Sequence, residues 1–301
     1  MTLLKAENIV LSFKKEQQRR LFGQERTTVL HGIDLELNTS ECLGIIGESG
    51  SGKSTLGRVL CGLLAPDSGR VLINGVELYG RRTKQGNSLV RNKMAVVFQD
   101  YSTSVNPRFR VQSILHESFR ALRLAGAQIS SEEEYRRSCE LLERVGLDAA
   151  FMTRYPHELS GGQLQRVCIA RAVALKPQII LLDEAVSSLD AATQVQVMDL
   201  LKDLAKEHSL SYLFITHDLT AITYFCDRVR FMHGGRFVES VDDISKIHQI
   251  KNAYARELLH AVSSIGIPKI DSLAELEAAE RDMETIPNTS DVKHADTRVY
   301  F

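Results

Sequence analysis

The chain has 301 residues, 44% of them hydrophobic, which is enough for one large α/β domain or for one domain with a small appendage. A formal net charge of -1 does not indicate a basic face for nucleic acid. No apolar run approaches the roughly 20 residues of a membrane span, and the first residues lack the basic-then-apolar pattern of an export signal. We therefore expect a protein that is cytosolic or is held at a membrane only through a partner.

Cysteine and histidine spacing argues against an intrinsic metal site. No two of the five cysteines form a Cys-x-x-Cys pair, and most lie within apolar patterns, so we expect buried, reduced thiols. The nine histidines are scattered, with no His-x-x-x-His pair. The sequence therefore predicts no zinc or nickel site of its own.

The first third of the chain is rich in predicted strands. Residues 3–13 have the pattern of a strand, and the polar residues 14–28 that follow are expected to form an exposed loop. Apolar and acidic residues alternate over residues 33–37, which predicts a half-buried strand. Residues 71–78 form a predicted hairpin around an Asn-Gly turn, and residues 94–98 predict another apolar strand. This region therefore combines antiparallel and buried strands.

Residues 47–54, Gly-Glu-Ser-Gly-Ser-Gly-Lys-Ser, match the phosphate-loop pattern G-x-x-x-x-G-K-[ST]. An apolar predicted strand precedes them and a predicted helix follows. Glycines let backbone N–H groups approach phosphate oxygens, and the helix N-terminus adds partial positive charge. Lys53 supplies a full charge near the β- and γ-phosphates, and the Ser54 hydroxyl is placed to hold Mg²⁺. The strand–turn–helix context disfavours the alternative of a glycine-rich turn that merely contains a lysine.

The middle and the end of the chain differ in pattern. Residues 111–147 carry apolar residues at three- and four-residue spacing, which predicts helices that end at Gly146 and form a subdomain. Residues 229–239 predict a terminal hairpin. We expect a short acidic helix over residues 272–283 and a disordered tail over residues 286–301.

Polar residues follow three predicted strands and are expected to share one edge of the sheet. Asp183 closes a fully apolar strand, so its carboxylate should emerge where ligands bind in open α/β folds and could hold Mg²⁺. Glu184 follows it and can polarise an attacking water. Gln99 and His217 also end strands and are expected to point into the same crevice.

A second anion site is predicted at residues 159–163, Leu-Ser-Gly-Gly-Gln, just before a helical run. Ser160 can cap that helix, and Gly161 and Gly162 expose backbone N–H groups at its N-terminus. Taken alone, the segment fits an ordinary capped helix equally well.

Taken in chain order, these motifs resemble those of the ATPase subunit of ATP-binding-cassette transporters, over residues 3 to about 262. The order is residues 47–54, Gln99, residues 159–163, Asp183 with Glu184, the loop Ser188-Leu189-Asp190 and His217. The resemblance implies an α/β fold: a phosphate-loop ATPase core with a mainly parallel sheet, an antiparallel β subdomain and an inserted helical subdomain at about residues 105–165. It implies an ATPase domain over residues 1–262 and a C-terminal extension, partly disordered, over residues 263–301. Residues 159–163 are the family's own marker.

The resemblance also implies the role of each site residue. Catalysis is assigned to Glu184, His217 and Gln99, and Mg²⁺ binding to Ser54, Gln99 and Asp183. The residues assigned to ATP are Gly47, Glu48, Ser49, Gly50, Ser51, Gly52, Lys53, Ser54, Thr55 and Phe13. Phe13 would stack on adenine, although a Phe at a strand end is more often part of a core. The residues expected to cover the ATP of a partner subunit are Leu159, Ser160, Gly161, Gly162 and Gln163.

Partners follow from the same resemblance. Such subunits pair with a sister ATPase or with themselves, and their helical subdomain receives the coupling helices of two transmembrane permease subunits. A solute-binding protein acts indirectly, and nucleic acid is not expected. These partners would hold the chain at the cytoplasmic face of the inner or plasma membrane.

The choice of branch rests on shorter segments. Residues 98–100, 104–108 and 253–262 resemble the dipeptide, oligopeptide and nickel import branch. Residues 159–168 and 183–187 are more similar to the second ATPase of nickel importers. We expect nickel import, free or chelated, with a di- or oligopeptide importer as the alternative. A non-transport ATPase is disfavoured by the single cassette, and a non-catalytic cassette by intact Lys53, Glu184 and His217. The lack of cysteine after residue 226 excludes the iron–sulfur cluster of some branch members.

Overall fold

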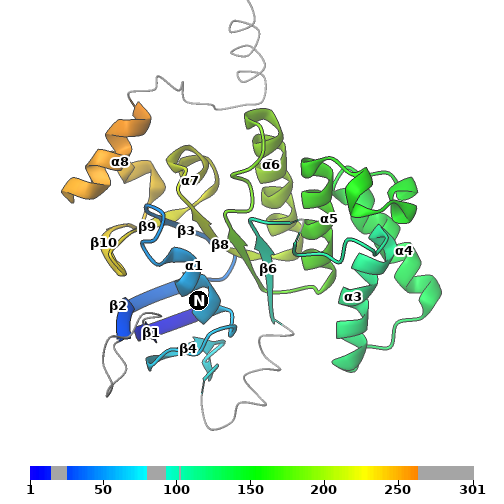
Figure 1. The fold of residues 1–301 in the computed structure, drawn as a ribbon, viewed down its shortest axis with the longest axis horizontal. Helices are drawn as coiled ribbons and strands as arrows, with labels where there is room; N and C mark the ends of the chain where they lie inside the picture. The colour runs from blue at the N-terminus through cyan, green and yellow to red at the C-terminus, as the bar shows by residue number, and fades with distance from the viewer. Residues whose placement is uncertain (15–25, 80–92, 102, 264–301) are drawn as a thin grey trace, which may run out of the picture. The chain divides into compact units, whose positions relative to one another are not determined.

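The structure is a computed structural model that describes residues 1–14, 26–79, 93–101 and 103–263. It contains a six-stranded sheet, a four-stranded sheet and a group of helices beyond one sheet edge (Figure 1). The predictions for residues 272–283 and 286–301 lie outside the described residues.

The six-stranded sheet has the order β10-β9-β3-β8-β7-β6 and is parallel except for the edge strand β10. Its strands are β3 (Cys42–Ile46), β6 (Met94–Phe98), β7 (Ile179–Asp183), β8 (Ser211–Thr216), β9 (Arg228–His233) and β10 (Arg236–Val241). Every residue of β3, β7 and β8 is buried, as expected for parallel strands covered on both faces. The mainly parallel core predicted from the sequence is therefore confirmed.

The second sheet is antiparallel, with the order β2-β1-β4-β5. Its strands are β1 (Thr2–Lys14), β2 (Arg26–Asn38), β4 (Ser68–Ile73) and β5 (Val76–Glu77). Leu35 is buried in β2 between exposed Asp34 and Glu36, which confirms the predicted alternation. The predicted Asn-Gly turn is also confirmed, because Asn74 and Gly75 both have positive φ, 50° and 75°.

The prediction of an exposed loop over residues 14–28 is wrong at both of its ends. Lys14 pairs with Arg26, and Phe13 pairs with Thr27, so the strands extend into the polar segment. Polar side chains are tolerated there because this end of the hairpin faces solvent, where main-chain pairing needs no apolar side chain. Residues 15–25 lie outside the described part of the chain.

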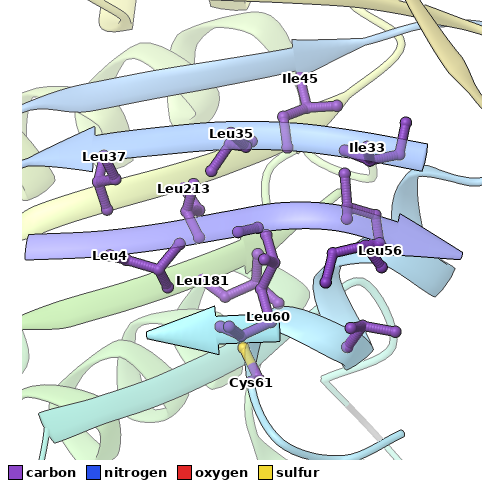
Figure 2. Packing of buried hydrophobic residues seen from close by; sticks show 14 of the residues in the cluster. Leu4, Ile33, Leu35, Leu37, Ile45, Leu56, Leu60, Cys61, Leu181 and Leu213 are labelled. Carbon is purple, nitrogen blue, oxygen red and sulfur yellow. The ribbon is translucent and has the colours of Figure 1, made fainter. Parts of the chain in front are cut away.

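One hydrophobic core joins both sheets through α1 (Lys53–Leu60). Leu56 and Leu60 of α1 belong to the same cluster as Leu4 of β1 and as Leu181 and Leu213 of the larger sheet (Figure 2). Full burial of a leucine side chain contributes about 1.5–3 kcal/mol, so this core fixes α1 firmly. The loop before α1 is thereby held at the edge where β3 ends.

The opposite face of the larger sheet is covered by α6 (Ala191–His208) and α7 (Leu219–Phe225). The Phe225 ring of α7 lies 5.2 Å from that of Phe214 and 5.4 Å from that of Tyr212, both on β8. The short helix η3 (Ile244–Gln249) follows β10, and α8 (Ala253–Ser263) packs on α7.

The helical subdomain is confirmed. It comprises α3 (Val111–Leu124), α4 (Ser131–Arg144), η1 (Ala149–Thr153), η2 (Pro156–Glu158) and α5 (Gly161–Ala174). Helices α3 and α4 pack on α5, which in turn contacts the edge strand β6. Gly146 follows the end of α4 with φ of 69°, as predicted for a helix stop.

Two further observations concern the whole described chain. All five cysteines are free thiols, and four are buried as predicted, whereas Cys139 on α4 is only partly buried. Within the described ranges, no helix is both long enough and apolar enough to cross a bilayer.

Candidate ATP site

The phosphate loop connects β3 to α1, and the close packing at its first residue requires glycine. A Cβ atom at Gly47 would lie 2.1 Å from the Met232 carbonyl oxygen and 3.0 Å from Ser51 Oγ. The loop is also tied to the β9–β10 turn, where the N–H of Gly235 donates to the carbonyl of Ser51 over 3.0 Å. The loop therefore has one shape that the neighbouring hairpin supports.

Lys53 spans the inside of this loop. Its Nζ donates to the carbonyl oxygens of Gly47 at 2.7 Å and Glu48 at 2.8 Å, and the residue is only 4% exposed. Burial lowers the pKa of Lys53, while the nearby carboxylates of Glu184 and Asp183 oppose that shift. The ammonium group is thus buried among loop carbonyls and carboxylates, at the centre of the predicted phosphate site.

Ser54 and Asp183 meet at the carboxyl end of β7. Ser54 Oγ donates to Asp183 Oδ1 over 2.9 Å, although the two residues are 129 positions apart. Asp183 is 7% exposed, and burial raises the pKa of its carboxyl while the Ser54 hydroxyl opposes the shift. A hydroxyl and a buried carboxylate are oxygen ligands that Mg²⁺ accepts.

Glu184 and His217 lie beside each other at the same edge. His217 Nδ1 is 3.5 Å from Glu184 Oε1, a separation too long for a strong hydrogen bond. Glu184 has a positive φ of 50°, and its N–H donates to the carbonyl of Ile215 over 2.8 Å, which turns the chain sharply after β7. Gln99 is exposed just after β6, and it shares this edge because Phe98 pairs with Asp183.

The marker segment forms the N-terminus of α5, as a capping box. Ser160 Oγ accepts from the N–H of Gln163 at 3.3 Å, and the Gln163 side chain accepts from the N–H of Ser160 at 3.0 Å. Gly161 contacts Tyr101 so closely that a Cβ there would lie 2.6 Å from Tyr101 Oη.

A pocket of about 420 Å³ opens at this end of α5. Residues of three segments line it: Tyr101, residues 160–163 with Arg166, and residues 188–190 with Thr193. Helix α5 lies among α3, α4 and α6, away from α1 (Figure 1). The structure therefore brings Lys53, Ser54, Asp183, Glu184 and His217 to one sheet edge but does not bring the marker segment of the same chain to them.

Phe13 does not belong to the core. It lies near the end of β1 and is 43% exposed. The alternative of a core phenylalanine is therefore wrong, and an exposed ring remains available for stacking.

Sequence reasoning missed two polar contacts of the site. Gln165 is fully buried in α5, and its Nε2 donates to the carbonyl of Ala185, next to Glu184. The hydroxyl of Tyr254 in α8 accepts from the N–H of Glu48 in the phosphate loop over 2.9 Å. The only sequence signal for Gln165 is its polar character on the buried side of a predicted helix. Tyr254 has no signal beyond its place in residues 253–262, which resemble the import branch.

A family model described as "ABC transporter" matches residues 30–187. The chain belongs to the ABC transporter family. It is 41% identical to the metal-staphylopine import system ATP-binding protein CntF of Staphylococcus aureus, over 82% of this chain and 94% of that protein. It is 38% identical to the oligopeptide transport ATP-binding protein OppF of Bacillus subtilis, over 84% of this chain and 82% of that protein.

Solved structures of the family share the fold. A dimeric post-hydrolysis structure of the ATP-binding cassette MJ0796, bound to ADP and Pi, has a TM-score of 0.69 and 29% identity, covering 79% of this chain and 97% of that one. The structure of cbiO1 from Clostridium perfringens, part of the ABC transporter complex cbiONQ, has a TM-score of 0.69 and 27% identity, covering 91% and 99%.

The chain is accordingly an ATPase that uses ATP and Mg²⁺, and its own residues fit both. The loop packs so closely on β9 at Gly47 that no side chain fits there, so its backbone is held in one shape. Among the described residues, Ser51 Oγ is buried inside the loop without a hydrogen-bond partner, and such a hydroxyl can serve a phosphate oxygen. The Ser54–Asp183 pair supplies hard oxygen donors.

Proposed function

We propose that the chain is the ATP-hydrolysing subunit of an import complex that takes up nickel, either free or bound by a small chelator. The observation that carries the hydrolytic part is the meeting of Lys53, Ser54, Asp183 and Glu184 at one sheet edge. Import is supported by CntF, which is named for metal-staphylopine import and aligns with 82% of this chain. The similarity to OppF, which is named for oligopeptide transport, supports a transport role.

The role of each residue follows from its place. Loop N–H groups, the N-terminus of α1 and Lys53 bind and neutralise the phosphates. Ser54 and Asp183, with Gln99 from the neighbouring strand, would hold Mg²⁺, which stabilises the charge that develops on the phosphates. Glu184 orients and polarises the attacking water, while His217 beside it contacts the γ-phosphate and positions Glu184. Exposed Phe13 would stack on the adenine.

The exposed N-terminus of α5 supports assembly in pairs. Ser160 and Gly161 at the start of α5 are exposed, and helix α5 lies away from α1, the helix that follows the phosphate loop (Figure 1). We infer that they cover ATP bound to a second ATPase subunit, either a sister chain or another copy. The dimeric form of the similar MJ0796 cassette supports this arrangement.

The remaining partners follow from the proposed transport role. The helical subdomain would receive two transmembrane permease subunits, and a solute-binding protein would deliver the cargo without touching this chain. The complex would place the subunit at the cytoplasmic face of the membrane. No nucleic acid is part of this proposal.

The cargo proposal rests on resemblance, because cargo need not touch this subunit. CntF is named for metal-staphylopine import, which favours a chelated metal, whereas OppF is named for oligopeptide transport and favours the alternative. Deletion of the gene should lower the cellular accumulation of radioactive nickel, and the wild-type gene but not the Glu184→Gln form should restore it. Unchanged nickel uptake together with resistance to toxic peptides would instead establish peptide import.

A further inference from the structure

A hydrogen bond joins the phosphate loop to the last described helix. The N–H of Glu48, the second residue of the loop, donates to Tyr254 Oη over 2.9 Å, although the two residues are 206 positions apart. Glu48 itself is exposed, whereas Gly47 before it is buried. The contact therefore fixes the loop at the point where it leaves the core.

Tyr254 is held firmly at this position. Its ring centroid lies 4.4 Å from that of His233, the last residue of β9. The start of α8 is capped by Asn252 Oδ1, which accepts from the N–H groups of Tyr254 at 3.0 Å and Ala255 at 3.3 Å. Ala255, one residue further, is fully buried. The phenol hydroxyl is thus presented to the loop from a fixed helix end.

The β9–β10 hairpin links these two supports of the loop. Glu239 of β10 anchors α8, because its Oε2 accepts from the N–H groups of Lys251 and Asn252, each at 2.8 Å. The turn of the same hairpin holds the loop directly, through the N–H of Gly235 and the carbonyl of Ser51. The hairpin therefore fixes the loop directly at Ser51. It also fixes the loop indirectly at Glu48, through α8, which the hairpin anchors.

We propose that Tyr254 is a positioning residue for ATP binding, through the hydrogen bond that its hydroxyl accepts from the loop at Glu48. The Glu48 N–H itself points to Tyr254, and the bond acts by holding the loop in the shape that it needs for phosphate, because any ordering of the loop on binding reduces the affinity. The Tyr254 side chain contacts Glu48 and His233 rather than Glu184 or His217, so its hydroxyl sets the affinity for nucleotide and leaves the chemical step unchanged. The inference goes beyond the import role and rests only on ATP binding at residues 47–54.

The test uses the full chain with Tyr254→Phe, which removes the hydroxyl and keeps the ring against His233. Loss of one neutral hydrogen bond predicts that the Kd for Mg·ATP and the KM rise by about two- to tenfold, with kcat unchanged. Hydrogen–deuterium exchange at the Glu48 amide, measured without nucleotide, should become faster. Tyr135→Phe on α4 is the matched control, because Tyr135 is an exposed tyrosine in the helical subdomain.

Glu239→Ala serves as a second variant, since it releases the start of α8 without touching the loop, and it should change the KM in the same direction. The inference is overturned if Tyr254→Phe leaves both the Kd and the Glu48 exchange rate unchanged, or if it lowers only the melting temperature. It is also overturned if Tyr135→Phe changes the KM equally. Lys53→Ala separates the causes of failure: if that variant binds ATP normally, the assignment of the phosphate loop itself has failed.

Discussion

The two helix N-termini at α1 and at α5 both contain serine and glycine, but their surroundings are very different. Helix α1 begins with a buried lysine and lies against a buried carboxylate, and the loop before it is tied to the β9–β10 turn. The start of α5 is satisfied by its own capping box and opens into a pocket. The first is therefore preorganised for phosphate within one chain, whereas we propose that the second meets a ligand presented by another subunit.

The largest effect is expected on the rate of ATP hydrolysis, from Glu184→Gln at the phosphate site beside α1. If Glu184 polarises the attacking water, kcat should fall by roughly two or more orders of magnitude while ATP binding is retained. Lys53→Ala is the comparison, because loss of the buried ammonium should weaken ATP binding itself. Steady-state hydrolysis and equilibrium binding of a fluorescent ATP analogue distinguish the two. Hydrolysis by Glu184→Gln at the wild-type rate would refute the assignment of Glu184.

A smaller effect is expected on ATP-dependent dimerisation, from Ser160→Ala at the N-terminus of α5, made in the Glu184→Gln background. The parent protein should form an ATP-dependent dimer, and loss of the Ser160 hydroxyl should weaken that dimer by about tenfold, because a hydrogen bond to a charged phosphate is lost. The affinity of the monomer for ATP should stay unchanged. Size-exclusion chromatography with light scattering measures the first quantity, and binding at low protein concentration measures the second.

Ser130→Ala is the matched control for this prediction. Ser130 caps α4 as Ser160 caps α5, accepting from the N–H of Glu133 at 3.1 Å. Each variant should lose about 1 kcal/mol of stability with its cap, but only Ser160→Ala should change dimerisation. A Glu184→Gln protein that stays monomeric with ATP and its sister subunit present would contradict the proposed pairing.

Features of the fold that depend on local sequence patterns could be predicted, and features that depend on pairing between distant segments could not. Strands β3, β7 and β8 were found because parallel strands buried on both faces are continuous apolar runs. The loop and the α5 cap were found because each is a short local motif. The polar strand ends at Lys14 and Arg26 were missed, since their stability comes from pairing across the hairpin rather than from apolar side chains.

Contacts between remote segments were beyond any local pattern. The hydrogen bond from Gln165 to the Ala185 carbonyl depends on how α5 packs beside the end of β7, and the bond from Glu48 to Tyr254 on how α8 packs beside the loop. The spacing of residues along the chain does not reveal how α5 packs beside β7 or how α8 packs beside the phosphate loop. The residues that position the site are therefore less predictable than the residues that belong to its motifs.

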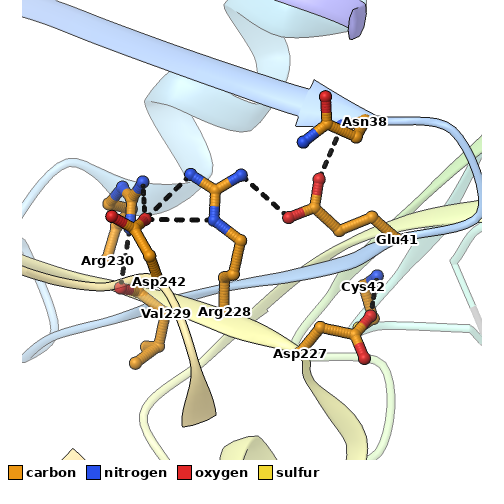
Figure 3. Close-up of polar contacts among 8 residues, drawn as sticks. All are labelled: Asn38, Glu41, Cys42, Asp227, Arg228, Val229, Arg230 and Asp242. Carbon is orange, nitrogen blue, oxygen red and sulfur yellow. Dashed lines mark hydrogen bonds and ion pairs between the residues drawn. The ribbon is translucent and has the colours of Figure 1, made fainter. Parts of the chain in front are cut away.

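The smallest effect is expected on the stability of the folded state, from an ion-pair cluster at the β9–β10 hairpin, which holds the phosphate loop before α1. Asp242, just after β10, accepts from the guanidinium groups of Arg230 at 2.7 Å and Arg228 at 2.9 Å, and Arg228 also contacts buried Glu41 (Figure 3). The Arg230 guanidinium, followed by that of Arg228, holds the pKa of Asp242 below its ordinary value. The Asp242 side chain is 71% exposed, so screening limits this contribution to about 1 kcal/mol or less.

The sign of the pH dependence follows from that lowered pKa. Asp242 stabilises the folded state while it is ionised, above its unfolded pKa of about 3.9, and this contribution is lost as the pH falls through the lower pKa of the folded state. Asp242→Asn should therefore lower the urea midpoint slightly at pH 7, and the difference from wild type should shrink below about pH 4. Asp203→Asn on α6, an exposed carboxylate away from the hairpin, is the control. A deficit that is the same at pH 7 and pH 3 would mean that the side chain acts through packing rather than charge.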